Sequence, residues 1–252
     1  MGATKVTLRI LGSGDPFGSG GRNQSGYFVE AGSRRILLDC GASAAAALKR
    51  HEADTAGVGL VLLTHFHGDH VAGLPFLYHD YQHVTTRRSP LVVAGPVGVR
   101  GRVERIYRTL YPGSANARRR FRVRYRVLAA GRVFRPPGMA GVRVVPFRVR
   151  HSVPGSSLGY RVEIAGRRLV YTGDTGWFPA LPRATRGAHL LLCECTYLNK
   201  VSAEHLCLSE LRAHRRCLGA RRILLTHLGP DLADLRSVPG FRLARDGMIV
   251  RV

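Results

Sequence analysis

The stretch LLTHFHGDHVAGLP, residues 62–75, contains three histidines and one aspartate within six positions. These residues are His65, His67, Asp69 and His70; an apolar run precedes them and a helix-compatible segment follows. Imidazole and carboxylate groups are preferred ligands of zinc and related divalent ions. Alternate residues on a turn from strand to helix can share one ion, while the next pair reaches a second. The spacing therefore predicts a two-metal site.

Three further candidate ligands each follow a segment that is typical of a strand. His151 follows an alternating stretch, Asp174 follows a short apolar run, and His227 follows the run ILLT at residues 223–226. The resulting seven residues are enough to hold two metals and to leave positions open for water and substrate. Taken singly, His151 could be a capping residue and Asp174 a turn residue. Their interpretation as metal ligands therefore depends on the cluster from His65 to His70.

These residues, together with several short motifs, resemble the metallo-β-lactamase superfamily and, within it, the ribonuclease Z-like branch. The motifs span almost the full length of the chain and are Leu11-Gly-Ser-Gly14-Asp-Pro, Asn23-Gln-Ser25 with Tyr27, Leu37-Leu-Asp39-Cys-Gly41, the segment from His65 to His70, Val153-Pro154 with Gly159-Tyr160-Arg161, Gly173-Asp174-Thr175, Glu194-Cys-Thr196, His205 and Thr226-His227. The resemblance implies an α+β fold, a four-layer αββα sandwich with the metals at one edge of the paired sheets. It also implies a single hydrolase domain over residues 1–252.

The resemblance further implies how the seven ligands divide between two zinc ions per chain. His65, His67 and His151 bind the first ion, Asp69, His70 and His227 bind the second, and Asp174 bridges them. The ions lower the pKa of a shared water, and Asp69 and Asp174 hold the resulting hydroxide in line for attack. Manganese or iron is an alternative, because the same donors accept either metal.

A glutamate and a histidine between the bridging aspartate and the last histidine belong to the same resemblance. Glu194 and His205 fall at these positions, and family enzymes use the pair to assist the leaving oxygen. An independent chemical reason supports this role. Expelling an alkoxide from a phosphodiester needs a proton or a positive charge beside it, and an imidazole held by a carboxylate supplies both. A surface ion pair is the alternative interpretation.

One segment departs from the ribonuclease Z pattern. The tRNA-processing enzymes carry a long glycine- and lysine-rich arm between the ligands that match His151 and Asp174, and they use it to grip the tRNA elbow. Here only Pro154 to Gly173 lie between the two ligands, and this segment predicts two strands joined by a tight turn at Ala165-Gly166-Arg167. Because the arm is missing, smaller phosphodiesters or another way of gripping RNA become alternatives to tRNA 3′ processing.

The net charge of the chain favours polyanionic partners. The chain has 39 Lys plus Arg against 16 Asp plus Glu, a formal net charge of +23, which speeds the capture of polyanions. Arginine forks match phosphate oxygens, and aromatic rings such as Phe121 or Tyr125 can stack on bases. The stretch from Arg100 to Arg126 contains ten arginines and is the candidate for nucleic-acid contact. Within it, the residues expected to make the contact are Arg118, Arg119, Arg120 and Arg122.

A compositional explanation of the arginines stays open. Only three of the 39 basic residues are lysines, as expected for a chain from a GC-rich genome. Moreover, Arg122, Arg124 and Arg126 alternate with apolar or aromatic residues, which is typical of the solvated face of an ordinary strand.

The remaining composition is typical of one compact enzyme domain. At 252 residues with 45% hydrophobic content, the chain can bury a two-sheet core. It has no run of 18 apolar residues, and residues 6–10 alternate like a first strand, so neither a membrane span nor a signal peptide is predicted and we expect a cytoplasmic protein. Five cysteines without a Cys-x-x-Cys pair argue against a disulfide framework.

The hydrophobic pattern predicts strand-rich halves that are each flanked by helices, which fits two facing sheets covered on the outside. Strands are expected near residues 4–11, 26–30, 34–39, 59–64, 90–94, 122–128, 142–149, 158–164, 167–172, 189–193 and 222–226. Helices are expected at residues 42–51, after Val71, at 97–110 and at 209–219.

These observations predict a dinuclear metal-dependent hydrolase of phosphodiester bonds, ribonuclease Z-like, with RNA such as a precursor tRNA as its substrate. The nearer alternative is a hydrolase of the same fold for a small substrate: a cyclic nucleotide or other phosphodiester, a lactone or a sulfate ester. A metal-bound RNA-binding protein without turnover is more distant, because no ligand is lost. A homodimer is compatible with the resemblance, since family members that dimerise place an arm or an arginine-rich face near the partner's active site. The metal, the oligomeric state and the physiological substrate stay open.

Overall fold

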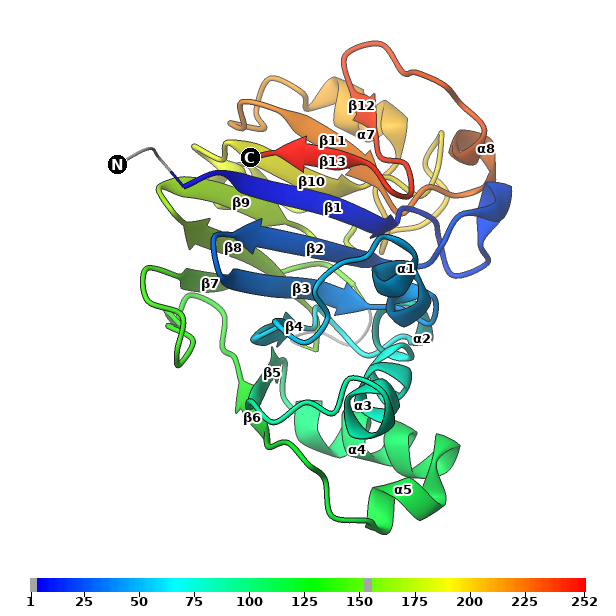
Figure 1. Ribbon diagram of the computed structural model, residues 1–252. Helices are drawn as coiled ribbons and strands as arrows, with labels where there is room; N and C mark the ends of the chain where they lie inside the picture. The colour runs from blue at the N-terminus through cyan, green and yellow to red at the C-terminus, as the bar shows by residue number, and fades with distance from the viewer. Residues whose placement is uncertain (1–3, 152–155) are drawn as a thin grey trace.

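Two β-sheets face each other in the computed structural model, which describes residues 4–151 and 156–252 (Figure 1). The first sheet has the strand order β13-β1-β2-β3-β4-β5-β6 and the second the order β12-β11-β10-β9-β8-β7. The strands are β1 Val6–Gly12, β2 Gly26–Ala31, β3 Arg34–Cys40, β4 Leu60–Leu62, β5 Leu91–Gly95, β6 Val123–Val127, β7 Arg143–Arg148, β8 Leu158–Ile164, β9 Arg167–Tyr171, β10 Leu190–Glu194, β11 Ile223–Thr226, β12 Arg242–Leu243 and β13 Ile249–Arg251. The motif residues Val153 and Pro154 lie outside the described residues.

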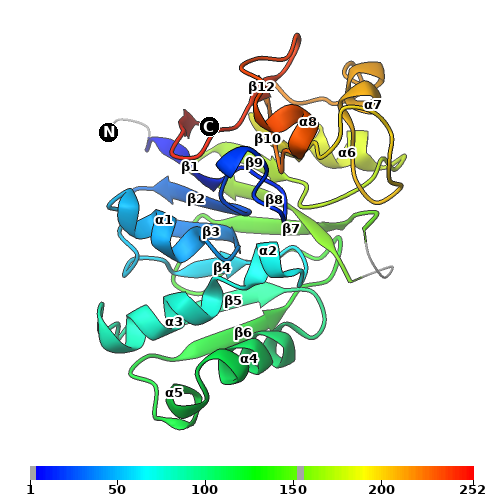
Figure 2. The same cartoon turned by 90° about the vertical axis from the view of Figure 1, so that its right-hand side faces the viewer.

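Helices cover the outer face of each sheet (Figure 2). Residues from α1 to α5 pack on the first sheet, and residues from α6 to α8 pack on the second. The helices are η1 Ser19–Gly21, α1 Ala44–Arg50, α2 Gly68–Val71, α3 Leu74–His83, α4 Val99–Leu110, α5 Pro112–Asn116, α6 Leu181–Thr185, α7 Leu208–Ala213 and α8 Pro230–Ala233.

The alternation of apolar side chains along the strands builds three separate apolar layers. On β3, Ile36 and Leu38 point into the core between the sheets, whereas Leu37 packs beneath the helices of the first sheet. On β10, Leu192 lies in the core between the sheets and Leu191 packs beneath the helices of the second sheet. Because both faces of these strands are buried, they are continuously hydrophobic. The four-layer αββα sandwich predicted from the sequence is confirmed.

Parallel pairing brings the important loops to one edge. Strands β3 to β6 run parallel in the first sheet, and β9 to β12 run parallel in the second. Strand β7 is antiparallel to β8, which is antiparallel to β9, so β7 and β9 point the same way. The carboxyl ends of β4, β7, β9, β10 and β11 are followed or occupied by His65, His151, Asp174, Glu194 and His227 respectively. The connectivity therefore positions a site at this edge.

The predicted elements match the structure with a few differences. The hairpin between β8 and β9 has the predicted tight turn, with Ala165 and Gly166 both at positive φ (46° and 74°), as a two-residue hairpin of type I′ requires. The helix predicted over 209–219 ends early, at Ala213. Beyond that point the ring of His214 stacks on Trp177, with centroids 3.9 Å apart, and this tertiary contact replaces a continued helix. The short strands β12 and β13 were not predicted.

All five cysteines are unpaired, and four of them are buried. Over the described ranges, none of the helices combines the length and the apolar character that a membrane crossing needs.

We predict that Leu8→Ala destabilises the protein by about 2–5 kcal/mol, because the fully buried Leu8 on β1 lies in the core between the sheets and its removal leaves a cavity. Urea unfolding followed by circular dichroism at a fixed zinc concentration measures the change. The matched control is Leu110→Ala at the end of α4, where the side chain is exposed and a change within roughly 0.5 kcal/mol is expected. Equal losses in the two variants would contradict this assignment of the core.

Candidate metal centre

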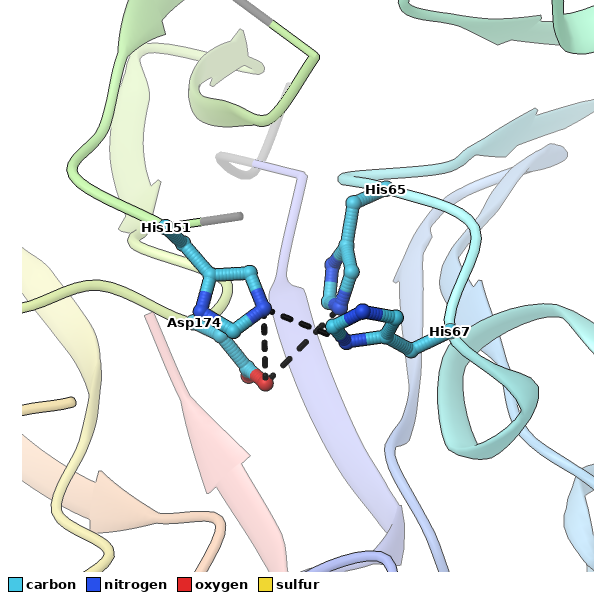
Figure 3. Close-up of side chains that lie close together, drawn as sticks. All are labelled: His65, His67, His151 and Asp174. Carbon is cyan, nitrogen blue, oxygen red and sulfur yellow. Dashed lines mark hydrogen bonds and ion pairs between the residues drawn. The ribbon is translucent and has the colours of Figure 1, made fainter. Parts of the chain in front are cut away.

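Four side chains from three segments meet at this edge of the sandwich (Figure 3). His65 and His67 follow β4, His151 follows β7, and Asp174 follows β9. One ligand atom from each lies within 4.8 Å of all the others. The Nε2 atoms of His65 and His151 lie 3.8 and 3.9 Å from Asp174 Oδ2. His67 is solvent-exposed whereas the other three are buried, so this group is open on the His67 side.

A second group shares Asp174, and all four of its members are buried. It consists of Asp69 and His70 on α2, Asp174, and His227 after β11. His70 Nε2 lies 3.1 Å from Asp174 Oδ1, and His227 Nε2 lies 3.3 Å from Asp174 Oδ2. Asp69 Oδ2 lies 3.2 Å from both of these Nε2 atoms. The structure thus brings together all seven residues predicted as ligands, in two groups that meet at Asp174.

The donor atoms of both groups fit divalent metal ions. Ligands at about 2.0–2.1 Å in a tetrahedral shell lie roughly 3.4 Å from one another, close to the separations in the second group. Among the described residues, His65 Nε2, His70 Nε2 and Asp174 Oδ1 are buried polar atoms that make no well-aligned hydrogen bond, although the last two lie 3.1 Å apart. Leaving such atoms buried without a partner costs free energy, which a bound cation would remove.

On the first sheet, the buried carboxylate of Asp39 holds two of the histidines. It accepts hydrogen bonds from the Thr64 hydroxyl at 2.8 Å, from Tyr171 at 2.7 Å and from His70 Nδ1 at 2.8 Å. The Thr64 hydroxyl, having donated its proton to Asp39, accepts from His65 Nδ1 at 3.0 Å. In the neutral form that metal binding requires, both imidazoles would keep their proton on Nδ1 and turn the Nε2 lone pair toward the centre.

On the second sheet, Glu194 holds histidines through hydrogen bonds in the same way as Asp39 does on the first. This buried carboxylate accepts from the backbone N–H of Thr175 at 2.6 Å, from the Thr196 hydroxyl at 2.9 Å and from His205 Nδ1 at 3.0 Å. The Thr196 hydroxyl in turn accepts from His227 Nδ1 at 3.1 Å. Because Glu194 is completely buried, the alternative of a surface ion pair with His205 is wrong.

His205 lies beside both groups of ligands. Its ring stacks on His227 with centroids 5.7 Å apart and meets the edge of His151 at 4.9 Å. Its side chain keeps 19% of its surface exposed, so it is reachable from solvent. Burial opposes protonation, but the hydrogen bond from His205 to Glu194 and the negative charge of that carboxylate outweigh it and raise the pKa of His205.

The charges in the second group stabilise one another. Burial alone would raise the pKa of Asp174, but the neighbouring His227 and His70 hold it well below its usual range. The pKa of Asp69 is likewise lowered, by His70 and by a hydrogen bond from His227, against the effect of burial. Burial disfavours the charged form of His227, yet Asp174 and Asp69 raise its pKa to about 9. Both carboxylates are therefore ionised near neutral pH.

Two residues of the centre have left-handed backbone conformations that non-glycine residues rarely adopt. Asp39 has φ of 53° and His227 has φ of 55°. Gly173, which precedes the shared aspartate, has φ of 59°, and a Cβ there would lie 2.7 Å from the Thr64 methyl group. Each such non-glycine residue costs about 1–3 kcal/mol, and this kind of strain concentrates at functional sites.

Asp39, Thr64 and Thr196 were not predicted as functional residues, although each lies within one of the quoted motifs. The available signal was position, because each lies at the end of an apolar strand, next to or near a candidate ligand. Threonine and aspartate are common at strand ends for other reasons, so this signal alone does not identify them.

The four arginines predicted to contact nucleic acid lie away from the metal centre. Arg118, Arg119, Arg120 and Arg122 precede β6, whose carboxyl end lies at the edge with the histidines. A five-residue strand spans about 17 Å at roughly 3.3 Å per residue. The structure therefore places these four arginines at the opposite edge of the first sheet.

Arg119 and Phe121 have partners within the fold. Arg119 donates two hydrogen bonds to Glu104, at 2.8 and 2.7 Å, and its guanidinium lies over the rings of Tyr107 and Tyr78. Phe121 is only 4% exposed and packs beneath α3 and α4, so the expectation that it stacks on bases is wrong. Arg118, Arg120 and Arg122 remain exposed.

An αββα sandwich with two groups of histidine and aspartate at one edge defines a class of metal-dependent hydrolases. A family model described as a beta-lactamase superfamily domain matches residues 34–228. A protein named ribonuclease Z, from Bradyrhizobium sp. strain ORS 278, is 30% identical over 95% of this chain and 97% of its own length. The chain belongs to the metallo-β-lactamase superfamily, in its ribonuclease Z-like branch.

Solved structures with low sequence identity share the fold. The short form of human tRNase Z has a TM-score of 0.76 and 23% identity, over 97% of this chain and 98% of that one. A diphosphatase from the PhnP family also has a TM-score of 0.76, with 20% identity over 97% of each chain. The alignment with the Bradyrhizobium protein extends over 298 positions, more than the 252 residues here, so that relative has segments that this chain lacks.

We predict that the chelator-treated protein is most stable near pH 6.5 and loses stability toward pH 9. The raised pKa of His227 means that its contribution is complete below about 6.5, its unfolded value, and is lost as pH rises through about 9. The buried His65, whose pKa is lowered by burial, makes stability fall below pH 6.5. Urea unfolding across this pH range measures both trends.

The matched control for this pH dependence is His227→Gln, which removes the titrating group while keeping a polar side chain. The decline above neutral pH should become shallower in this variant. A chelated wild-type protein whose stability increases steadily up to pH 9 would show that the cluster does not titrate in this way.

Proposed function

We propose that this chain is a dinuclear metal-dependent phosphodiesterase that cleaves RNA as an endonuclease of the ribonuclease Z type. The observation that carries the proposal is the geometry of the two groups of ligands. They share the Asp174 carboxylate and lie beside a histidine that a buried glutamate holds. In this proposal His65, His67 and His151 would hold one ion, Asp69, His70 and His227 would hold the other, and Asp174, which belongs to both groups, would be shared between the ions.

Each part of the centre then has a chemical task. When bound, two divalent ions, zinc in the simplest case, would supply the Lewis acidity that acidifies a water molecule and offsets charge on the phosphoryl oxygens. The ionised Asp69 and Asp174 line the position of the attacking water and orient it by accepting its hydrogen bonds. The hydrogen bonds that fix Nδ1 of His65, His70 and His227 keep the ligands in place without reorganisation during turnover.

His205 is the proposed general acid. Its Nδ1 is held by Glu194, which leaves Nε2 free to deliver a proton. The raised pKa of His205 keeps the imidazole protonated to higher pH than in water. In this role His205 protonates the departing ribose oxygen, and the resulting imidazole is reprotonated from solvent on its exposed side.

RNA is supported as the substrate by the relative named ribonuclease Z and by the net charge of +23. The second candidate is a smaller phosphodiester, and the hairpin between β8 and β9 favours it. Its turn has only two central residues, Ala165 and Gly166, and offers no long arm with which to hold a tRNA elbow.

The proposal is tested by turnover of zinc-loaded protein on two substrates, a precursor tRNA with a 3′ trailer and bis-p-nitrophenyl phosphate. We expect cleavage of the trailer, loss of activity on chelation, and loss in Asp69→Ala, which removes one ligand of the second group. Metal analysis should find about two ions per chain. Turnover of the small diester with the tRNA left intact would favour the second candidate, and activity that survives complete chelation would refute both.

We predict that His205→Ala lowers kcat on RNA by roughly 10²–10⁴-fold but affects bis-p-nitrophenyl phosphate much less. A ribose alkoxide needs a proton to leave, whereas p-nitrophenolate leaves without one. The control is His83→Ala, an exposed histidine at the end of α3, for which no change is expected on either substrate. If His205→Ala lost the same factor on both substrates, His205 would not be the acid for the leaving group.

A further inference from the structure

A hollow of about 790 Å³ lies along the outer side of α4 and is lined by arginines. Arg100, Arg105 and Arg108 of α4 line it, together with the Glu104–Arg119 ion pair. A neighbouring hollow of about 440 Å³ shares Arg100 and the ion pair and extends to Arg124 and Arg126 on β6. We call the two together the α4–β6 groove.

The spacing of residues on α4 explains why the arginines gather here. Val99, Val103 and Tyr107 recur every fourth residue and are buried against the first sheet. Arg100 and Arg108 lie eight residues apart on the neighbouring stripe, about 100° around the helix from the buried one, with Glu104 midway between them. At 1.5 Å per residue the two arginines are about 12 Å apart along the helix axis. The groove therefore has positive charge along its length.

Most of this charge has no counter-ion within the fold. Glu104 is the only acidic residue that lines the described hollows, and Arg119 already neutralises it through two hydrogen bonds. Five further arginines line the groove, and all of them are exposed: Arg100, Arg105, Arg108, Arg124 and Arg126. Within the described part of the chain, none of the five forms an ion pair with an acidic side chain. Charged side chains on β6 also protect an edge strand from pairing. That explanation does not extend to the arginines of α4.

The groove begins near the metal centre. Arg126 on β6 pairs with Ala94 on β5, and the Ala94 carbonyl accepts a hydrogen bond from the backbone of Leu63 on the neighbouring segment. His65 follows Leu63 by two residues. Strand β6 is therefore two strand spacings, each of about 4.8 Å, away from the segment that contains Leu63. The end of the groove at Arg126 thus lies about 10 Å to the side of the segment that leads to His65. From there α4 runs away from the metal edge (Figure 2), and the residues that line the larger hollow follow this helix.

We infer that the α4–β6 groove binds the sugar-phosphate backbone of the RNA on one side of the scissile bond and so replaces the long arm. This inference rests on the proposed function. Guanidinium groups pair with phosphate oxygens through two parallel hydrogen bonds, and a row of them follows a backbone without reading its sequence. The groove offers five such groups without an ion-pair partner in the described part of the chain, in a row that starts near the metal edge at Arg126 and continues along α4, whereas Arg118, Arg120 and Arg122 do not line it.

The test compares two triple variants with equal loss of charge. In the first, Arg100→Gln, Arg105→Gln and Arg108→Gln remove the α4 side of the groove. In the control, Arg167→Gln, Arg186→Gln and Arg221→Gln remove three exposed arginines from the amino edge of the second sheet, opposite the metal centre. Both triples carry Asp69→Ala to prevent cleavage, and binding of fluorescein-labelled precursor tRNA is measured by anisotropy between 50 and 200 mM salt.

The groove triple should bind the RNA roughly 10- to 100-fold more weakly at 0.1 M salt, with the slope of log K against log salt reduced by about 2–3. The control triple should bind the RNA as tightly as the parent protein, which carries only Asp69→Ala. Equal weakening in both triples, or no weakening in the groove triple, would overturn the inference. Failure of the proposed function shows separately, as absence of phosphodiester turnover by the zinc-loaded wild-type chain, and unfolding of either triple is excluded by its thermal melting curve.

Discussion

A buried imidazole is a useful metal ligand only when its second nitrogen is held, and here two buried carboxylates do the holding from opposite sheets. Asp39 at the end of β3 and Glu194 at the end of β10 each accept a hydrogen bond from a threonine hydroxyl, which accepts in turn from a ligand histidine. The two halves of the sandwich thus contribute matching arrangements of carboxylate, hydroxyl and imidazole. The strained backbone at Asp39 is tolerated because several hydrogen bonds depend on its position.

The sequence singled out the candidate ligands because their chemistry is uncommon in a cluster and because each lies after a strand, and the structure brings all seven together. It also predicted the layers, since the alternation on β3 and the continuous apolar run on β10 leave few other packings. It did not reveal Thr64 and Thr196, because a threonine that supports a metal ligand looks the same in sequence as one that ends a strand. The early end of α7 was equally hidden, because it depends on the contact between His214 and Trp177, which are far apart along the chain.

The structure distinguishes arginines that stabilise the fold from arginines that are free to contact a ligand, which the composition alone cannot do. Arg119 is part of the fold, since it joins Glu104 and covers two tyrosine rings. Other arginines on α4 form a row only because the buried stripe of that helix forces its remaining positions outward. A bias toward arginine in the sequence therefore fills a surface stripe that packing had already defined, and the connection of β5 to α4 brings one end of that stripe close to the metal edge.

The hairpin between β8 and β9 has a consequence for how this fold diversifies. Its turn lies at the end of two paired strands, with Ala165 and Gly166 both exposed, so residues added there would not disturb a ladder hydrogen bond or a buried side chain. Lengthening such a loop costs only about 0.6 kcal/mol for each doubling. The hairpin lies between two ligands in sequence, yet its tip lies at the end of the strands opposite to them. Appendages can therefore be gained or lost at this tip without any change to the residues of the candidate metal centre.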